Sequence, residues 1–238
     1  MTSLDYHVTS LDYIVYSDKL SYRLKSGWMS TIEIGFEWTR GGHYECGPAR
    51  TDKTVQVIRQ VDKWKGTYRP LEIERSNLHL RFAELGSSPD AYVKFATAWG
   101  LLETPAAKGA METVEKWRRE VRKMKGLISV LALKNPLPGG ILRSGRGIRF
   151  QATKIDVAVL SVEAGSRPTM ILEPPTLLSA IYLQLATALA SGNSIRVCAE
   201  CSRWFHTGIG QKTRRSVAIF CSEECKNRHH YKQRKAKQ

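Results

Sequence analysis

Four cysteines near the end of the chain have the residue type and the spacing of a metal site. Cys198 and Cys201 form a C-x2-C pair, and Cys221 and Cys225 form a C-x3-C pair after a gap of 19 residues. Four thiolates in a tetrahedron suit zinc, and a closed set of four leaves no position for a reacting water. Four unbound or disulfide-bonded cysteines would fit this paired spacing less well. The sequence therefore predicts one structural Zn2+ ion held by these four residues.

The residues around each pair indicate how the four thiols would be brought together. A C-x2-C turn presents two thiolates from one tight knuckle. Ser222 is a good N-cap and two glutamates follow it, so we expect a helix that begins beside Cys221 and carries Cys225 one turn later. Strand-like residues 203–205 and 217–220 would form a hairpin between the two pairs. The arrangement predicted is a small treble-clef-like zinc finger.

Positive charge is concentrated in the same part of the chain. From Arg196 to the end there are 11 Lys and Arg against 3 Asp and Glu, a net +8 of the +15 carried by all 238 residues. Such an excess favours a polyanionic partner, although a solvated basic tail would have the same composition.

The predicted helix gives this charge a direction. With Cys221 and Cys225 facing the metal, Arg228 falls on the metal side and other cations fall on the opposite side. Three further cations lie in the turn of the predicted hairpin. The residues expected to bind nucleic acid are Lys212, Arg214, Arg215, Lys226, His230, Arg234 and Lys237.

The first 190 residues have the pattern of a larger α+β domain. Ser88 can cap a helix whose apolar side ends before Gly100, and apolar residues recur at helical spacing from Met111 to Leu131. Thr176 can cap a third helix. Strands are expected at residues 30–38, 148–162 and 167–173, the last two as a hairpin, and a loop at residues 41–50. His43 and Cys46 lie in that loop, and we expect no metal or catalytic role for them.

The chain shows no signal for secretion or for membrane insertion. It lacks a basic start followed by an apolar stretch and a cleavage site, and no run of apolar residues approaches 18. We therefore expect a cytoplasmic protein with no membrane partner, in which clustered cysteines bind metal more often than they form disulfides.

The C-terminal segment resembles the CGNR zinc finger family. Lys226 stands where the family's name motif has glycine. The residues that carry the resemblance are Leu183–Ala190, Ile195–Cys198, Trp204-Phe205, Arg214-Arg215, Phe220–Ser222 and Cys225–Arg228. The resemblance implies a zinc-bound, DNA-binding C-terminal module of a bacterial transcription regulator, preceded in many members by an ABATE domain that is proposed to sense a stress or a ligand.

The leading hypothesis is a zinc-dependent DNA-binding protein that acts on duplex DNA in transcription. Residues 191–238 would form the zinc finger, and residues 1–190 a domain that senses a small-molecule signal or forms a homodimer. Two alternatives stay open, a zinc-stabilised protein-interaction module and an RNA-binding module. A nuclease is disfavoured because His206, His229 and His230 have no Asp near them and only Asn227 as a helper. We therefore expect no enzyme activity, and these three histidines rank as surface residues.

Overall fold

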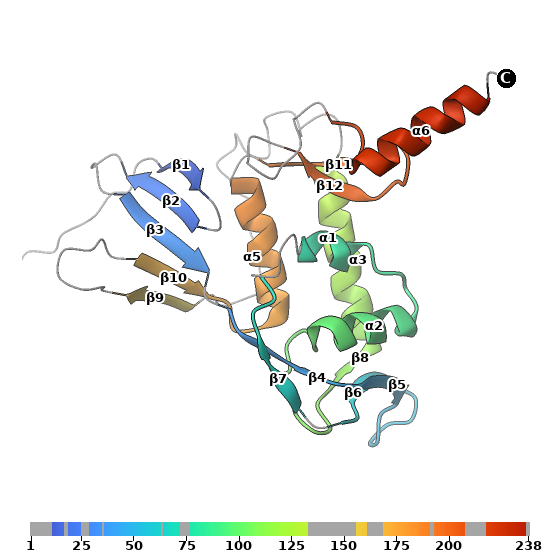
Figure 1. The fold of residues 1–238 in the computed structure, drawn as a ribbon. Helices are drawn as coiled ribbons and strands as arrows, with labels where there is room; N and C mark the ends of the chain where they lie inside the picture. The colour runs from blue at the N-terminus through green and yellow to red at the C-terminus, as the bar shows by residue number, and fades with distance from the viewer. Residues whose placement is uncertain are drawn as a thin grey trace, which may run out of the picture.

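The structure is a computed structural model that contains both helices and sheets, so the predicted α+β class is confirmed (Figure 1). It describes residues 11–16, 19–24, 29–34, 36–62, 64–71, 77–132, 156–160, 169–190, 193–207 and 218–236.

A five-stranded sheet forms one side of the molecule and is assembled from two distant parts of the chain. The strand order is β1-β2-β3-β10-β9, with β10 parallel to β3 and every other pair antiparallel. The antiparallel pairing of β9 with β10 confirms the predicted pair of strands, and the rest of the two predicted segments, residues 148–155, 161–162 and 167–168, lies outside the described residues. The strands of this sheet are β1 (Leu11–Tyr16), β2 (Lys19–Leu24), β3 (Met29–Ile34), β9 (Asp156–Leu160) and β10 (Thr169–Glu173).

Two smaller sheets occupy the other end of the larger domain. One pairs β4 with β7, and the other has the order β5-β6-β8. Their strands are β4 (Trp38–Gly41), β5 (Tyr44–Pro48), β6 (Gln56–Gln60), β7 (Trp64–Tyr68) and β8 (Met111–Thr113).

These sheets correct three sequence predictions. The single strand expected at residues 30–38 is divided between β3 and β4. Half of the loop expected at residues 41–50 is strand β5, because Tyr44 to Pro48 pair antiparallel with β6. The helix expected from Met111 begins at Val114, because β8 pairs with the other edge of β6. In each case a neighbouring strand supplies the backbone hydrogen bonds that decide the local conformation.

Helices build the main core around Trp117, whose side chain is fully buried. Its ring stacks at 5.8 Å from that of Tyr92 and also contacts Phe82 and Phe95. The predicted N-cap Ser88 is confirmed, since its hydroxyl oxygen accepts from the N–H of Ala91. The helices are α1 (Leu78–Ala83), α2 (Pro89–Trp99), α3 (Val114–Leu131) and α5 (Leu177–Ala190).

The C-terminal module consists of a hairpin and one projecting helix. The hairpin pairs β11 (Ser194–Val197) with β12 (Trp204–Thr207), and α6 (Glu223–Lys235) extends from it away from the rest of the molecule (Figure 1). The module has its own small cluster of buried residues, separate from the main core. Ile195 of β11 nevertheless belongs to the main core, so the hairpin is packed against the larger domain.

A buried histidine pair joins the larger domain to this hairpin. His79 of α1 is 1% exposed, and its Nε2 lies 2.7 Å from Nε2 of His206 on β12. Gln184 of α5 fixes the proton positions: its Oε1 lies 3.2 Å from the backbone N–H of His79, which donates to it, and 2.7 Å from Nδ1 of the same residue. Nδ1 of His79 is therefore the protonated nitrogen, and Nε2 accepts the N–H of His206. Because His206 is partly buried in this contact, its expected place on the surface is wrong.

Burial favours the neutral form of both rings. Burial lowers the pKa of His79 to about 3, with a further decrease from the neighbouring His206, and burial lowers the pKa of His206 to about 4. An unfolded histidine titrates near pH 6.5. The pair's contribution to stability is therefore complete above about pH 6.5 and decreases as the pH falls toward the folded-state values.

We predict that the free energy of unfolding falls between pH 6.5 and 5 by about 1.4 kcal/mol per pH unit for each of the two histidines. The variant His206→Gln keeps an N–H that can donate to His79 but cannot titrate. The slope of its unfolding free energy against pH should therefore be smaller by the contribution of one proton, about 1.4 kcal/mol per pH unit. Denaturant unfolding at several pH values, with metal in excess, measures both slopes. Equal slopes in the two proteins would contradict the neutral buried pair.

Candidate metal centre

The first two cysteines lie in the turn that joins β11 to β12. The N–H of Cys198 donates to the carbonyl of Arg203 at 2.9 Å, and the N–H of Ser202 donates back to the carbonyl of Cys198 at 2.9 Å. Ser202 adopts a φ of 57°, in the left-handed region that a tight reversal requires. These bonds make the predicted knuckle and bring Cys201 next to Cys198.

The second two cysteines lie at the start of α6. The hydroxyl oxygen of Ser222 accepts the N–H of Cys225 at 3.1 Å, which confirms the predicted N-cap, and Cys221 comes just before it. The segment that leads into α6 is tied to the knuckle, because the N–H of Ala199 donates to the carbonyl of Ile219 at 2.9 Å. Residues separated by about 20 positions in sequence therefore meet at one point.

The four sulfur atoms lie within 4.8 Å of one another. Sγ of Cys221 is 3.5 Å from that of Cys201 and 3.5 Å from that of Cys225. A tetrahedral ion with metal–sulfur bonds of about 2.3 Å would separate its sulfur ligands by about 3.8 Å. This separation lies between the 3.5 Å of the two short sulfur–sulfur distances and the 4.8 Å limit of the cluster. None of the cysteines forms a disulfide. The donor set and its dimensions therefore fit one metal ion.

The ionisation of the thiols shows why a cation fits this cluster. Burial opposes the thiolate of Cys198, but N–H groups of Cys201 and Cys221 outweigh it and lower its pKa to about 6. Burial likewise opposes the thiolate of Cys201, whose pKa is nevertheless lowered by Arg203. At Cys221, burial and the neighbouring sulfur atoms together raise the pKa to about 12. Without a compensating charge the cluster stabilises some thiolates and resists others, whereas a bound dication would stabilise all of them.

The predicted hairpin between the two cysteine pairs needs correction. Residues 204–207 do form a strand, but their partner is 194–197, which precedes the first pair. Residues 218–220 form no strand, and 208–217 lie outside the described residues. The knuckle is thus the turn of the hairpin itself.

A carboxylate in the knuckle also holds α6. Glu200, whose side chain is 5% exposed, lies 2.5 Å from Nζ of Lys232 and 3.5 Å from Nδ1 of His229. The hydrogen bond from Lys232 lowers the pKa of Glu200. The ring of His229 also lies 5.2 Å from that of Phe220. Arg228, expected on the metal side, is exposed, and the α6 side chains that contact Glu200 of the knuckle are His229 and Lys232.

The seven residues expected to bind nucleic acid are only partly described. Lys226 is exposed and pairs with Glu223 at 2.9 Å. His230 and Arg234 are exposed on α6. The other four, Lys212, Arg214, Arg215 and Lys237, lie outside the described residues.

Sequence reasoning missed the contacts that fix α6 and the hairpin. Lys232 and His229 follow Cys225 at spacings of seven and four, so the helical periodicity that placed Cys225 could have found them. The contact between His79 and His206 spans 127 residues, and no local pattern indicates it.

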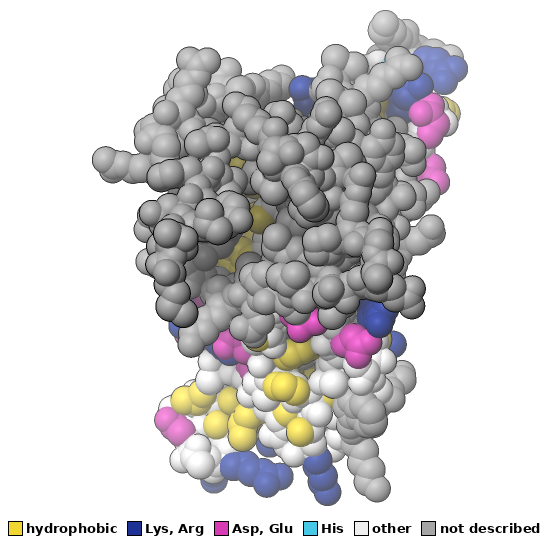
Figure 2. Space-filling view, turned by 90° about the vertical axis from the view of Figure 1, so that its left-hand side faces the viewer, with side chains coloured by type: hydrophobic (Ala, Val, Ile, Leu, Met, Phe, Trp, Pro, Cys, Tyr) yellow, Lys and Arg dark blue, Asp and Glu magenta, His cyan; other side chains and the backbone are white. Residues whose placement is uncertain are grey.

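On one other face of the molecule, the charge of the described residues is mixed. In the part of the face that Figure 2 colours, Lys and Arg side chains lie next to Asp and Glu rather than forming one basic patch. Within the part of the chain that the structure describes, no helix is long and apolar enough to cross a membrane.

Comparison with known proteins gives no relative: no family model, no curated protein and no solved structure matches the chain.

Among the residues described, Cys198, Cys201, Cys221 and Cys225 are the only group of three or more potential metal ligands brought together.

We predict that the purified protein contains about one equivalent of divalent metal and that four of its five thiols resist a thiol reagent until a chelator is added. Cys225→Ser should lose the metal and expose the remaining ligand thiols. Cys46→Ser is the matched control, because Cys46 lies outside the cluster, and it should remove one reactive thiol while the metal stays bound. Thiols that all react at once in a metal-free protein would contradict the site.

Proposed function

We propose that this protein is a zinc-dependent DNA-binding protein that acts in bacterial transcription. The observation that carries the proposal is the double role of α6. This helix supplies Cys225 to the sulfur cluster, and its other sides carry exposed cations. A metal that holds the start of the helix would thereby hold those cations in a fixed direction.

Zinc is the metal that we propose for the site. Four soft sulfur donors suit zinc or iron, and a closed set of four with no open position suits a structural ion. The small cluster around the sulfurs contains few buried side chains, chiefly Phe205 and Phe220. So small a core is not enough to fold a module of this size, and structural zinc supplies about 10–16 kcal/mol of apparent binding energy in comparable fingers.

Duplex DNA is the partner that we propose for α6. A single helix fits the major groove, and cations beside it neutralise phosphates. The net +8 of the last 43 residues is the charge that such binding requires. The resemblance of this segment to CGNR zinc fingers supports the same proposal, with a cytoplasmic location and a larger domain that senses a signal or forms a dimer.

We predict that the affinity of the zinc-loaded protein for duplex DNA depends steeply on salt. About five phosphate contacts give a log–log slope near −4 to −5. The double variant Lys226→Ala, Arg234→Ala should flatten the slope by up to about 2 while zinc stays bound. Lys108→Ala, which removes an exposed cation of the larger domain, is the control and should leave the slope unchanged.

Competition with single-stranded RNA distinguishes the alternatives. If RNA displaces duplex DNA at equal concentration, the module binds RNA instead. If neither nucleic acid binds at low salt although one zinc ion is present, DNA binding is excluded and a protein-docking role takes its place. If the double variant has the same salt dependence of DNA binding as the wild-type protein, α6 does not contact the DNA.

A further inference from the structure

The rotation of α6 about its own axis is fixed by three contacts on one side. Cys225 joins the sulfur cluster, and Lys232 and His229 both contact the carboxylate of Glu200. Positions separated by four and seven residues share one face of a helix. The opposite face must therefore point away from the module, and its composition indicates what α6 can contact.

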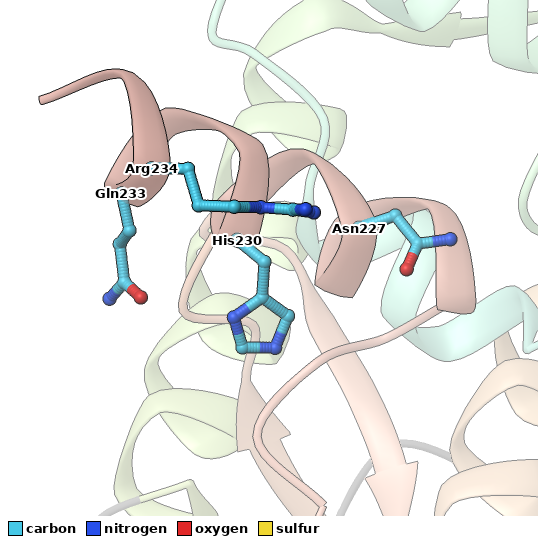
Figure 3. Close-up of a pocket in the computed structure, with 4 residues that line it drawn as sticks. All are labelled: Asn227, His230, Gln233 and Arg234. Carbon is cyan, nitrogen blue, oxygen red and sulfur yellow. The ribbon is translucent and has the colours of Figure 1, made fainter. Parts of the chain in front are cut away.

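An open pocket of polar side chains lies over that opposite face and extends to Gln233, which is nearer the metal side and contacts His229 at 3.1 Å. Asn227, His230, Gln233 and Arg234 line it, and each is exposed. Figure 3 shows the Arg234 side chain extending along the helix toward Asn227, while His230 and Gln233 project from the helix beside it. At about 100° per residue, Asn227, His230 and Arg234 lie at about 200°, 140° and 180° from Cys225.

The cations that complete the exposed surface lie on both sides of this face. On the same scale, Lys226 lies at about 100°, and Lys235 and Arg228 lie at about 280° and 300°. A helix in the major groove directs its central face at the base edges and its flanks at the two phosphate backbones. The polar centre and the basic flanks of α6 match this division.

The side chains at the centre have the hydrogen-bonding groups that read bases. The amide of Asn227 offers one donor and one acceptor to a single base, as the N7 and N6 edge of adenine requires. The guanidinium of Arg234 offers parallel donors that match O6 and N7 of guanine. Neither side chain forms a hydrogen bond or an ion pair with another residue that the structure describes, so both are available to a ligand.

We propose that this face of α6 reads DNA sequence in the major groove, with Asn227 on adenine and Arg234 on guanine. The proposal rests on the proposed DNA-binding function and adds sequence specificity to it. Seven residues of helix span about 10.5 Å, and successive base pairs are about 3.4 Å apart. The two bases are therefore about three base pairs apart, and His230 faces the pairs between them.

Selection of duplexes from a random library by the zinc-loaded full chain tests this assignment. The wild-type protein should enrich a site of three to four base pairs with G and A at that separation. Arg234→Lys keeps the charge but loses the paired donors, so discrimination at the G position should fall about 10- to 100-fold with the salt slope unchanged. Asn227→Ala should relax the A position alone.

Lys235→Ala on the flank is the matched control. It should weaken binding to all sequences alike and flatten the salt slope by about one, without changing the enriched site. Tight binding with no enriched site, or the same site from Arg234→Lys and Asn227→Ala, would overturn base reading and leave general DNA binding intact. A zinc-loaded protein that binds no duplex would overturn both proposals.

Discussion

Four cysteine sulfur atoms within 4.8 Å of one another, two from buried and two from half-buried residues, are the constraint on which the C-terminal module depends. Their environment already stabilises the thiolate of Cys198 and opposes that of Cys221, so full ionisation needs a cation among them. Two sulfurs come from the knuckle and two from the start of α6. A cation bound by all four sulfur atoms would therefore also join the hairpin to α6. The hairpin and α6 otherwise share few contacts.

The position of α6 relative to the larger domain is set in two successive steps. First, the hairpin is fixed to the core: Ile195 is buried there, the N–H of Trp204 donates to Glu84 at 2.9 Å, and His206 bonds to His79. Second, the turn of the same hairpin holds α6 through the sulfur cluster and Glu200. Because α1 contacts α5 through Gln184, a change in the packing of these two helices would bear directly on the hairpin.

Local chemistry was enough to predict the caps and the cysteine cluster, but not the pairing of strands. Ser88 and Ser222 cap helices through bonds to residues three positions away, so their roles are visible in a short stretch of sequence. Strands β3 and β10 are parallel neighbours although about 140 residues separate them, and β8 replaces the first turn of a predicted helix because β6 lies beside it. The same distinction explains why Cys225 was placed correctly and His206 was not.

Charge alone gives an incomplete account of α6. Its five cations are not equivalent, because Lys232 is held by Glu200, whose side chain is 5% exposed, whereas Lys226 pairs with the exposed Glu223. An exposed pair of this kind contributes little and can exchange its partner for a phosphate, but the pair with Glu200 also positions the helix. Lys232 is thus best regarded as a positioning residue. The net charge of the tail includes all five cations equally. The contacts on the metal side determine which of these cations can reach a polyanion.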